Sequence, residues 1–311
     1  MRPITVAIGL ATAASANSIS TSQTPYAGQI ILNGAVATFS INNVATAQDP
    51  AGASNLTLTS TVGSFAQPRY LYITSAANDS ALTFTVTGVG VNGQPITEVI
   101  TGANAKARAS VNRYVSVSNI AVSGDAGSVQ VGSFALATLA ETRRVLITNA
   151  GNETGNTFTI TGTNWAGDVI SETIAGATAG TLQSVLDYKT VTSITISADA
   201  AGALTIGTSG VGGSKWVRFD DFAPNAISIQ ATVSGTVNYT IQSTLDNPNT
   251  VGTTITPSTV TWVSSSDTAV VGATATAQSN FLFAPVFARV LINSGTGTVT
   301  TTFLQSSNGP A

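Results

Sequence analysis

The chain contains a tandem duplication, and this feature constrains its fold more than any other. The text from residue 69 to residue 126 returns at 143 to 200, a shift of 74 residues without a gap, and about 25 of the 58 aligned positions are identical. After one inserted residue, the match continues to Gly132 in the first copy and Gly207 in the second. Chance does not produce such a match, so the middle of the chain is one folding unit present twice.

Each copy has the pattern of short strands. In TFTVTG (83–88) and TFTITG (157–162), threonines alternate with apolar residues until a glycine ends the run. A period of two with β-branched and aromatic residues is typical of half-buried strands, and about five such runs fall within each copy. The sequence therefore predicts an all-β protein: tandem small antiparallel β-sandwich or barrel modules, followed by a C-terminal jelly-roll-like β domain.

We expect the chain to divide into five segments. They are an N-terminal strand or arm (1–24), a partial or diverged β module (25–68), the two repeats (69–140 and 141–214) and a C-terminal β-sandwich domain (215–311). Within the second segment, Asn33-Gly34 separates two short β runs, which predicts a hairpin.

The N-terminal arm begins with an alternating pattern in which Ile4, Val6, Ile8 and Leu10 are the large apolar residues. A free segment of this composition cannot bury enough apolar area to offset its ordering entropy. We expect these residues to add a strand to a sheet edge, either on the chain's own domains or on a neighbouring subunit. The second alternative would make the segment an assembly arm that anchors the protein in a particle.

Composition excludes several classes of function. The chain has no cysteine and no histidine, so thiol chemistry, imidazole catalysis and zinc sites with these ligands are excluded. A net charge of −3 predicts no nucleic-acid partner, and the apolar runs are too short to predict a membrane partner. The pair Arg143-Arg144 is interpreted as a solvated loop edge. We expect no enzyme, no cofactor and no metal.

The surface is predicted to be weakly charged. Only 8% of the residues are charged, about a third of the usual share, and the mean hydropathy is +0.29. Such a surface is poorly suited to a free monomer, and open sheet edges need covering. We therefore expect a homo-oligomer.

Two glutamates occupy equivalent mid-strand positions in the copies. Glu98 and Glu172 each lie between two isoleucines on one strand face, where an unpaired carboxylate is costly. Arg69 and Arg143 are also equivalent, so a structural Arg–Glu pair inside each unit is predicted. Two duplicated ligand sites are the alternative, but neither copy has a base, nucleophile or metal motif nearby.

The tryptophans provide a different hypothesis. Trp165, Trp216 and Trp262 could form a sugar-stacking surface, although single aromatic residues at strand positions are usually core. A carbohydrate site would use Trp165 with Asn164 and Asp168, in the loop after TFTITG. The first copy has Val, Gly and Gln at these positions, so such a site is not duplicated with the fold.

The repeated pattern R-x-x-x-I-T-x-A…TFT[VI]TG…G-x-x-I-[TS]-E…G…V-x-x-I, at 69–120 and 143–194, resembles repeated β modules of tailed-bacteriophage structural proteins. The C-terminal texts VSGTVNYTIQSTLDNP (233–248) and ARVLINSGTGTVTTTFLQ (288–305) resemble them too, so the similarity covers roughly 25–305.

This resemblance implies a virion component. Together with the absence of histidine and cysteine and the weakly charged, threonine-rich β surface, it predicts a non-enzymatic structural subunit on the capsid, as a decoration, cement or head-fibre protein. The absence of cysteine favours assembly in the reducing host cytoplasm. A tail, collar or tail-fibre component is the alternative within that class, and a carbohydrate-binding adhesive β module is the alternative from another class. The resemblance also implies a trimer, with major capsid or tail subunits as partners.

Overall fold

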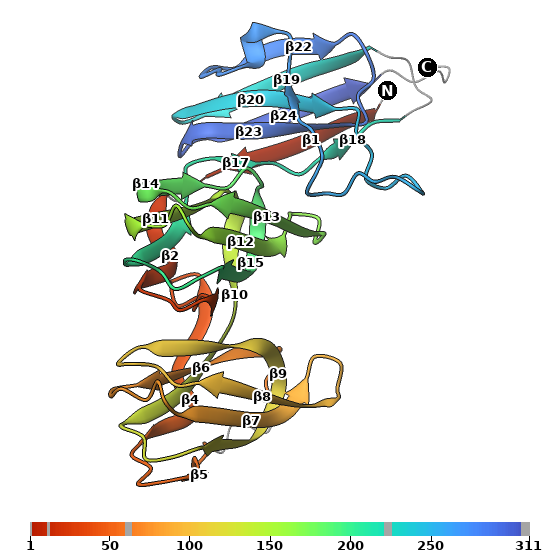
Figure 1. Cartoon of the computed structure of the whole chain (residues 1–311). Coiled ribbons are helices and arrows are strands. Elements are labelled where there is room, and N and C mark those ends of the chain that lie inside the picture. The colour runs from red at the N-terminus through yellow and green to blue at the C-terminus, as the bar shows by residue number, and fades with distance from the viewer. Residues whose placement is uncertain (1, 11–12, 60–63, 221–225, 306–311) are drawn as a thin grey trace.

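The computed structural model describes residues 2–10, 13–59, 64–220 and 226–305. The described part of the chain is all-β apart from one 3₁₀ turn, η1 (Thr268–Val270), so the predicted fold class is confirmed. Three β-sandwiches are stacked in a column (Figure 1). We call them the first module, the second module in the middle, and the C-terminal domain.

The first module has two layers that share one long bent strand. Its strands are β4 (Ala37–Gln48), β5 (Ser54–Asn55), β6 (Arg69–Ser75), β7 (Thr83–Gly90), β8 (Pro95–Thr101), β9 (Ala107–Val122) and β10 (Val129–Arg143). One layer has the order β4-β10-β6-β9, and the other has the order β5-β9-β7-β8. Strand β9 belongs to both because it shifts register and passes from β6 to β7.

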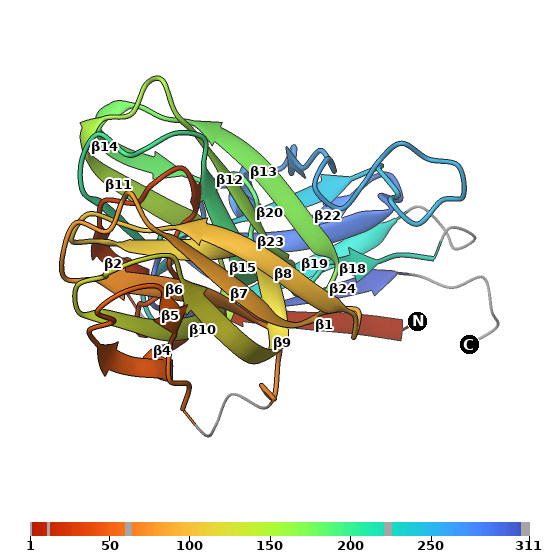
Figure 2. The same cartoon turned by 60° about the horizontal axis from the view of Figure 1, so that its bottom comes forward.

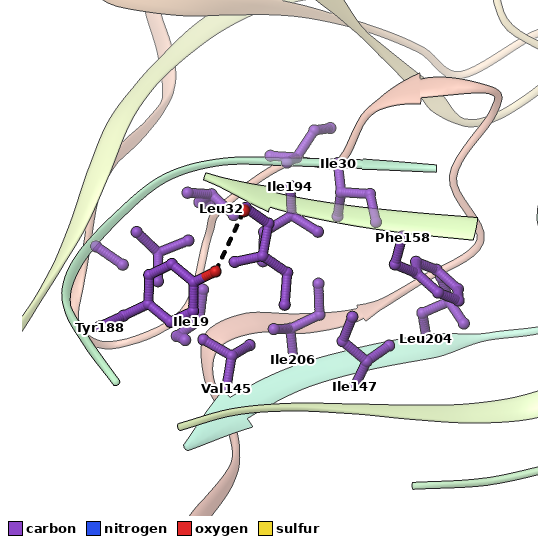
Figure 3. Packing of buried hydrophobic residues seen from close by; sticks show 14 of the residues in the cluster. Ile19, Ile30, Leu32, Val145, Ile147, Phe158, Tyr188, Ile194, Leu204 and Ile206 are labelled. Atoms are coloured by element: carbon purple, nitrogen blue, oxygen red, sulfur yellow. Dashed lines mark hydrogen bonds between the residues drawn. The ribbon is translucent and has the colours of Figure 1, made fainter. Parts of the chain in front are cut away.

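The second module repeats this arrangement. Its strands are β2 (Ser15–Gln23), β3 (Gly28–Gln29), β11 (Val145–Asn152), β12 (Thr157–Thr163), β13 (Val169–Ala175), β14 (Thr178–Gln183), β15 (Tyr188–Ile196) and β16 (Leu204–Thr208). The layers are β2-β16-β11-β14 and β3-β15-β12-β13, so β14 and β15 together correspond to the bent β9. Between them lies an apolar core in which the Tyr188 hydroxyl donates to the Ile160 carbonyl at 3.2 Å (Figure 3). The end of β10 pairs with β15 and joins the modules.

The C-terminal domain is a jelly roll. Its strands are β1 (Arg2–Gly9), β17 (Gly212–Gly213), β18 (Val217–Arg218), β19 (Ile227–Ser234), β20 (Val237–Thr244), β21 (Val263–Ser264), β22 (Ala277–Phe281), β23 (Phe287–Gly295) and β24 (Thr298–Gln305). If β17 and β18 count as one strand and the strands are numbered in chain order, the two sheets have the orders 1-8-3-6 and 2-7-4-5. This order is that of an eight-stranded jelly roll, as predicted.

The N-terminal segment contributes a strand to each of the three sandwiches. Strand β1 pairs with β24, β2 pairs with β16, and β4 pairs with β10. The modules also receive equivalent loop contacts, because Leu56 N donates to Ile120 O and Ile30 N to Ile194 O, both at 2.8 Å. The C-terminal domain is thus interrupted by the second module, which is itself interrupted by the first. The predicted separate module over 25–68 is wrong, because this segment completes both modules.

The alternating N-terminal residues form the strand that their pattern predicts. All eight residues of β1 pair antiparallel with β24, and the two strands lie side by side in Figure 2. Val6, Ile8 and Leu10 are buried in the core of the C-terminal domain, and Ile4 packs against it. Of the two expected alternatives, the structure shows the intramolecular one. These residues are core residues of their own domain, which corrects their interpretation as an assembly arm.

The predicted hairpin at Asn33-Gly34 is also wrong. Gly34 N donates to Ile19 O at 2.9 Å, and Val36 N donates to Ser18 O at 3.0 Å. Residues 34–36 therefore run alongside β2 and hydrogen-bond to it before the chain crosses into the first module. A Cβ on Gly34 would lie 2.1 Å from Ser18 O, so the glycine serves this close approach.

Candidate functional site

The duplicated glutamates hold a bulge in the bent strand. The Glu98 carboxylate accepts from Val111 N at 2.6 Å, from Asn112 N at 3.1 Å and from the Tyr114 hydroxyl at 3.1 Å. Residues 111 and 112 lie where β9 leaves its register with β6, so their amides need acceptors from outside the ladder.

The second module repeats this network residue by residue. Glu172 accepts from Val185 N at 2.9 Å, from Leu186 N at 3.2 Å and from the Tyr188 hydroxyl at 3.2 Å. Burial raises the pKa of Tyr188, and the neighbouring Glu172 raises it further. The tyrosine therefore stays a neutral donor to the carboxylate.

The predicted Arg–Glu pairs are wrong. Arg69 Nη1 donates to Ser133 Oγ at 3.4 Å, and Arg143 Nη1 donates to the Ser209 carbonyl at 3.1 Å, so both arginines reach toward the strand that ends the module. Burial lowers the pKa of both arginines. In the described part of the chain, each glutamate instead binds two backbone amides of the bulge and a tyrosine hydroxyl.

Sequence reasoning missed a second duplicated carboxylate, that of Asp79 and Glu153. Both side chains are buried. Asp79 accepts from Gly127 N at 3.2 Å and from Ser75 Oγ, and Glu153 accepts from Ala201 N at 2.8 Å. The two lie 74 residues apart in the texts NDS and NET, and this alignment was the signal that could have found them. The two glutamates at the bulge and the buried Asp79 and Glu153 each hold backbone amides of their own module, which is a structural role.

The candidate site is a cleft between the second module and the C-terminal domain, with a volume of about 310 Å³. All three tryptophans of the chain line it. Trp165 lies between β12 and β13, Trp216 directly precedes β18, and Trp262 directly precedes β21. None of the three is fully buried, so their interpretation as core residues is wrong. We call this site the tryptophan cleft.

Two of the rings contact each other, and two have a cation over one face. The centroids of Trp216 and Trp262 lie 5.2 Å apart with an interplanar angle of 65°, which is an edge-to-face contact. The Arg289 guanidinium carbon lies 4.4 Å from the Trp262 ring centroid, and Lys215 Nζ lies 5.6 Å from that of Trp165. Cations therefore already stack on two of the rings.

A group of three charged residues lies beside the rings. Arg289 Nη1, from β23, donates to Asp187 Oδ2 at 2.8 Å, and Arg144 Nε lies 3.5 Å from Asp187 Oδ1. The side chains of Arg289 and Asp187 are only 9% and 7% exposed. Burial lowers the pKa of Arg289, and Asp187 opposes this effect. Arg144 lines the cleft and Arg143 is buried, so their interpretation as a solvated loop edge is wrong.

Three polar atoms of the cleft lack hydrogen bonds. Trp165 Nε1, Arg144 Nε and Asp187 Oδ1 are buried, and none has a hydrogen-bond partner among the described residues. Buried polar atoms in native proteins are nearly always satisfied. Arg144 Nε and Asp187 Oδ1 are in ion-pair contact at 3.5 Å, so Trp165 Nε1 is the atom of the three that most needs a ligand or an ordered water.

The three residues predicted for a carbohydrate site have different roles in the structure. Asn164 Nδ2 donates to Asp168 Oδ2 at 3.0 Å, and Asn164 Oδ1 accepts from Asp168 N at 3.0 Å, so these residues hold the turn between β12 and β13. Asn164 and Trp165 line the cleft. Sequence reasoning missed Asp187 and Arg289, because nothing in the text links them across about a hundred residues.

No group of acidic residues suited to a metal ion occurs in the described ranges. Nor do those ranges contain a helix of the length and apolar character that crossing a membrane requires.

No protein-family model matches the chain, and no curated protein matches it. A chain from "The Triple Jelly Roll Fold and Turret Assembly in an Archaeal Virus" is similar at 13% identity and a TM-score of 0.22, over 86% of this chain and 89% of that one. A likeness at this TM-score carries no argument, so the jelly-roll assignment depends on the strand order alone.

Proposed function

We propose that the chain is a non-enzymatic structural subunit of a tailed-phage particle, located on the capsid as a decoration, cement or head-fibre protein. The observation that carries this proposal is the column of three nested sandwiches, in which β1 and β24 place both ends of the described chain in the C-terminal domain (Figure 1). In this proposal, the C-terminal domain attaches to the particle and the first module projects away from its surface. The resemblance of the module text to phage structural proteins supports the same role.

The nested topology suits a particle subunit that is exposed to mechanical and proteolytic stress. Each sandwich is closed by a strand from the N-terminal segment, so neither module is joined to the rest by a single linker. Strand β1 also covers an edge that β24 would otherwise leave open for pairing with other chains.

The partners that we propose are further copies of the chain, as a trimer, together with major capsid or tail subunits. Exposed apolar side chains support self-association. Leu245, Val263 and Leu282 are 69%, 61% and 87% exposed, and with Phe283 they line one hollow beside the edge strands β21 and β22. Grouped exposed apolar residues mark interaction surfaces.

Two experiments test these proposals. Mass spectrometry of purified particles, followed by gold-labelled antibody against the chain, should place it on the capsid. Labelling at the tail or collar would support that position instead, and absence from purified particles would refute a virion role. Light scattering should show an oligomer that Leu282→Ser weakens, whereas the control Val111→Ser on the first module leaves it intact. A stable monomer at high concentration would refute self-association.

A carbohydrate-binding adhesive module is the second candidate function. The convergence of all three tryptophans on one cleft is the observation that favours it.

A further inference from the structure

We propose that the tryptophan cleft binds a saccharide that carries a carboxylate. This inference goes beyond the structural role and does not depend on where the chain is located in a particle. It is carried by the rings, the unsatisfied polar atoms and the charge of the cleft.

The rings indicate a ligand with apolar faces and polar edges. The largest fully buried side chains of the protein are tyrosines and phenylalanines, whereas all three tryptophans are half-buried at one place. An indole offers a flat apolar face and one N–H donor. A pyranose ring fits such a surface, because its C–H face packs on the ring while its hydroxyl groups reach the edges. A cationic ligand is disfavoured because Arg289 and Lys215 already stack on the indoles.

The unsatisfied donors indicate acceptor oxygens. Trp165 Nε1 is a buried donor without a hydrogen-bond partner in the described chain, and Arg144 Nε has only its 3.5 Å ion-pair contact with Asp187; both residues line the cleft. Leaving such donors unpaired costs the protein stability, so a ligand that supplies oxygen acceptors is favoured there. The volume of about 310 Å³ is at the lower end for ligand pockets and equals the space of roughly ten waters. This space suits one or two sugar rings.

The charge of the cleft indicates an acid. Two guanidinium groups, those of Arg144 and Arg289, share the single carboxylate of Asp187, so the group carries one excess positive charge. Arg289 already donates to Asp187 Oδ2 at 2.8 Å and to Gln242 Oε1 at 2.9 Å. Among the described residues, the Arg144 guanidinium makes only the 3.5 Å contact with Asp187, and it offers the planar fork that matches a carboxylate.

The first module shows that the sandwich does not require these residues. At the positions of Arg144, Asn164, Trp165 and Asp187 it has Tyr70, Gly90, Val91 and Arg113, yet its strand order is the same. The cleft residues therefore serve the junction with the C-terminal domain, the ligand, or both.

Tryptophan fluorescence of the full chain reports on this cleft alone, since no tryptophan lies elsewhere. We would titrate digalacturonate and sialyllactose, with lactose as the neutral sugar and adenosine monophosphate as a non-sugar anion. An acidic sugar should give a saturable change, and lactose should bind at least about tenfold more weakly, because a charged hydrogen bond is lost. Arg144→Gln should remove this preference. Trp165→Phe, which keeps a ring but removes the N–H, should weaken both sugars.

Arg113→Gln, at the position in the first module that is equivalent to Asp187, is the matched control and should titrate like the parent chain. Circular dichroism establishes that each variant is folded. A cleft that only joins two domains predicts no saturable change with any saccharide, and that result would overturn the proposal. Equal binding of lactose, tighter binding of adenosine monophosphate, or unchanged titrations of both cleft variants would overturn it as well.

Discussion

The nested topology makes a prediction that sequence distance alone would never suggest. Ile8→Ala should destabilise a domain whose other strands lie between residues 212 and 305, because Ile8 is 3% exposed in the core of that domain and pairs with Val299. Ile19→Ala is the matched substitution for the second module, since Ile19 is fully buried in its core.

The magnitude follows from burial. Removing most of a buried isoleucine loses its transfer free energy and leaves a cavity, which together cost about 2–5 kcal/mol. At 1.4 kcal/mol for each factor of ten, this loss raises the population of the opened domain roughly 30- to 4000-fold. Core amides that exchange only through opening should exchange faster by the same factor.

Hydrogen exchange with peptide resolution is the assay. Ile8→Ala should accelerate exchange in β19, β23 and β24, while β7 and β9 of the first module keep their rates. Ile19→Ala should instead accelerate β11, β12 and β16. Ala7→Ser, at an exposed position of the same strand, is the control and should change nothing beyond β1. Acceleration by Ile8→Ala within β1 alone would refute the nesting.

Three further outcomes follow from individual contacts. Gly162→Ala should cost about 1–3 kcal/mol or more in urea unfolding, since its Cβ would lie 2.0 Å from Thr190 O, whereas Gly155→Ala meets no atom within 4 Å and should stay within about 0.5 kcal/mol. Asp187→Asn should cost about 3–5 kcal/mol, because the buried Arg289 loses its counter-charge; a loss below about 1 kcal/mol would contradict this role. Burial raises the pKa of Tyr188, so an unfolded chain loses this proton above about pH 10 while the folded chain keeps it. Stability should therefore fall as the pH rises from about 10, and Tyr188→Phe should reduce that slope.

The repeat made much of the fold predictable, because a period-two pattern found in two aligned copies marks the same strands twice. The motif glycines also have a local cause: a Cβ on Gly88 would meet Ser116 O at 2.2 Å, and one on Gly162 would meet Thr190 O at 2.0 Å. Each glycine lies at a register shift where the bent strand approaches closely. Such steric requirements act at a single position, and so they are visible in the amino-acid sequence.

Strand partners and the tryptophan cleft were not predictable in this way. Alternation shows which face of a strand is buried but not which strand lies beside it, so the pairing of β2 with β16 and of β4 with β10 left no signal. Strands β3 and β5 are two residues long, too short for any periodicity. The cleft joins Trp165, Trp216 and Trp262 from two domains, and only the topology brings them together.

Nesting also lowers the folding cost of the long-range strand pairs. Pairing Ile8 with Val299 closes a loop of almost the whole chain, and non-local closure slows folding. The first module, however, is formed by the contiguous strands β4 to β10 and can fold first. It then holds the start of β4 against β10, where Ala37 pairs with Ala137, so that the segments leading to β2 and β11 leave the same folded body and the second module closes a much shorter flexible loop. Closure of the second module in turn brings β1 and β17 together, so that the jelly roll can form. Since the closure cost depends on the flexible length that remains, each inner sandwich makes the closure of the next one nearly local.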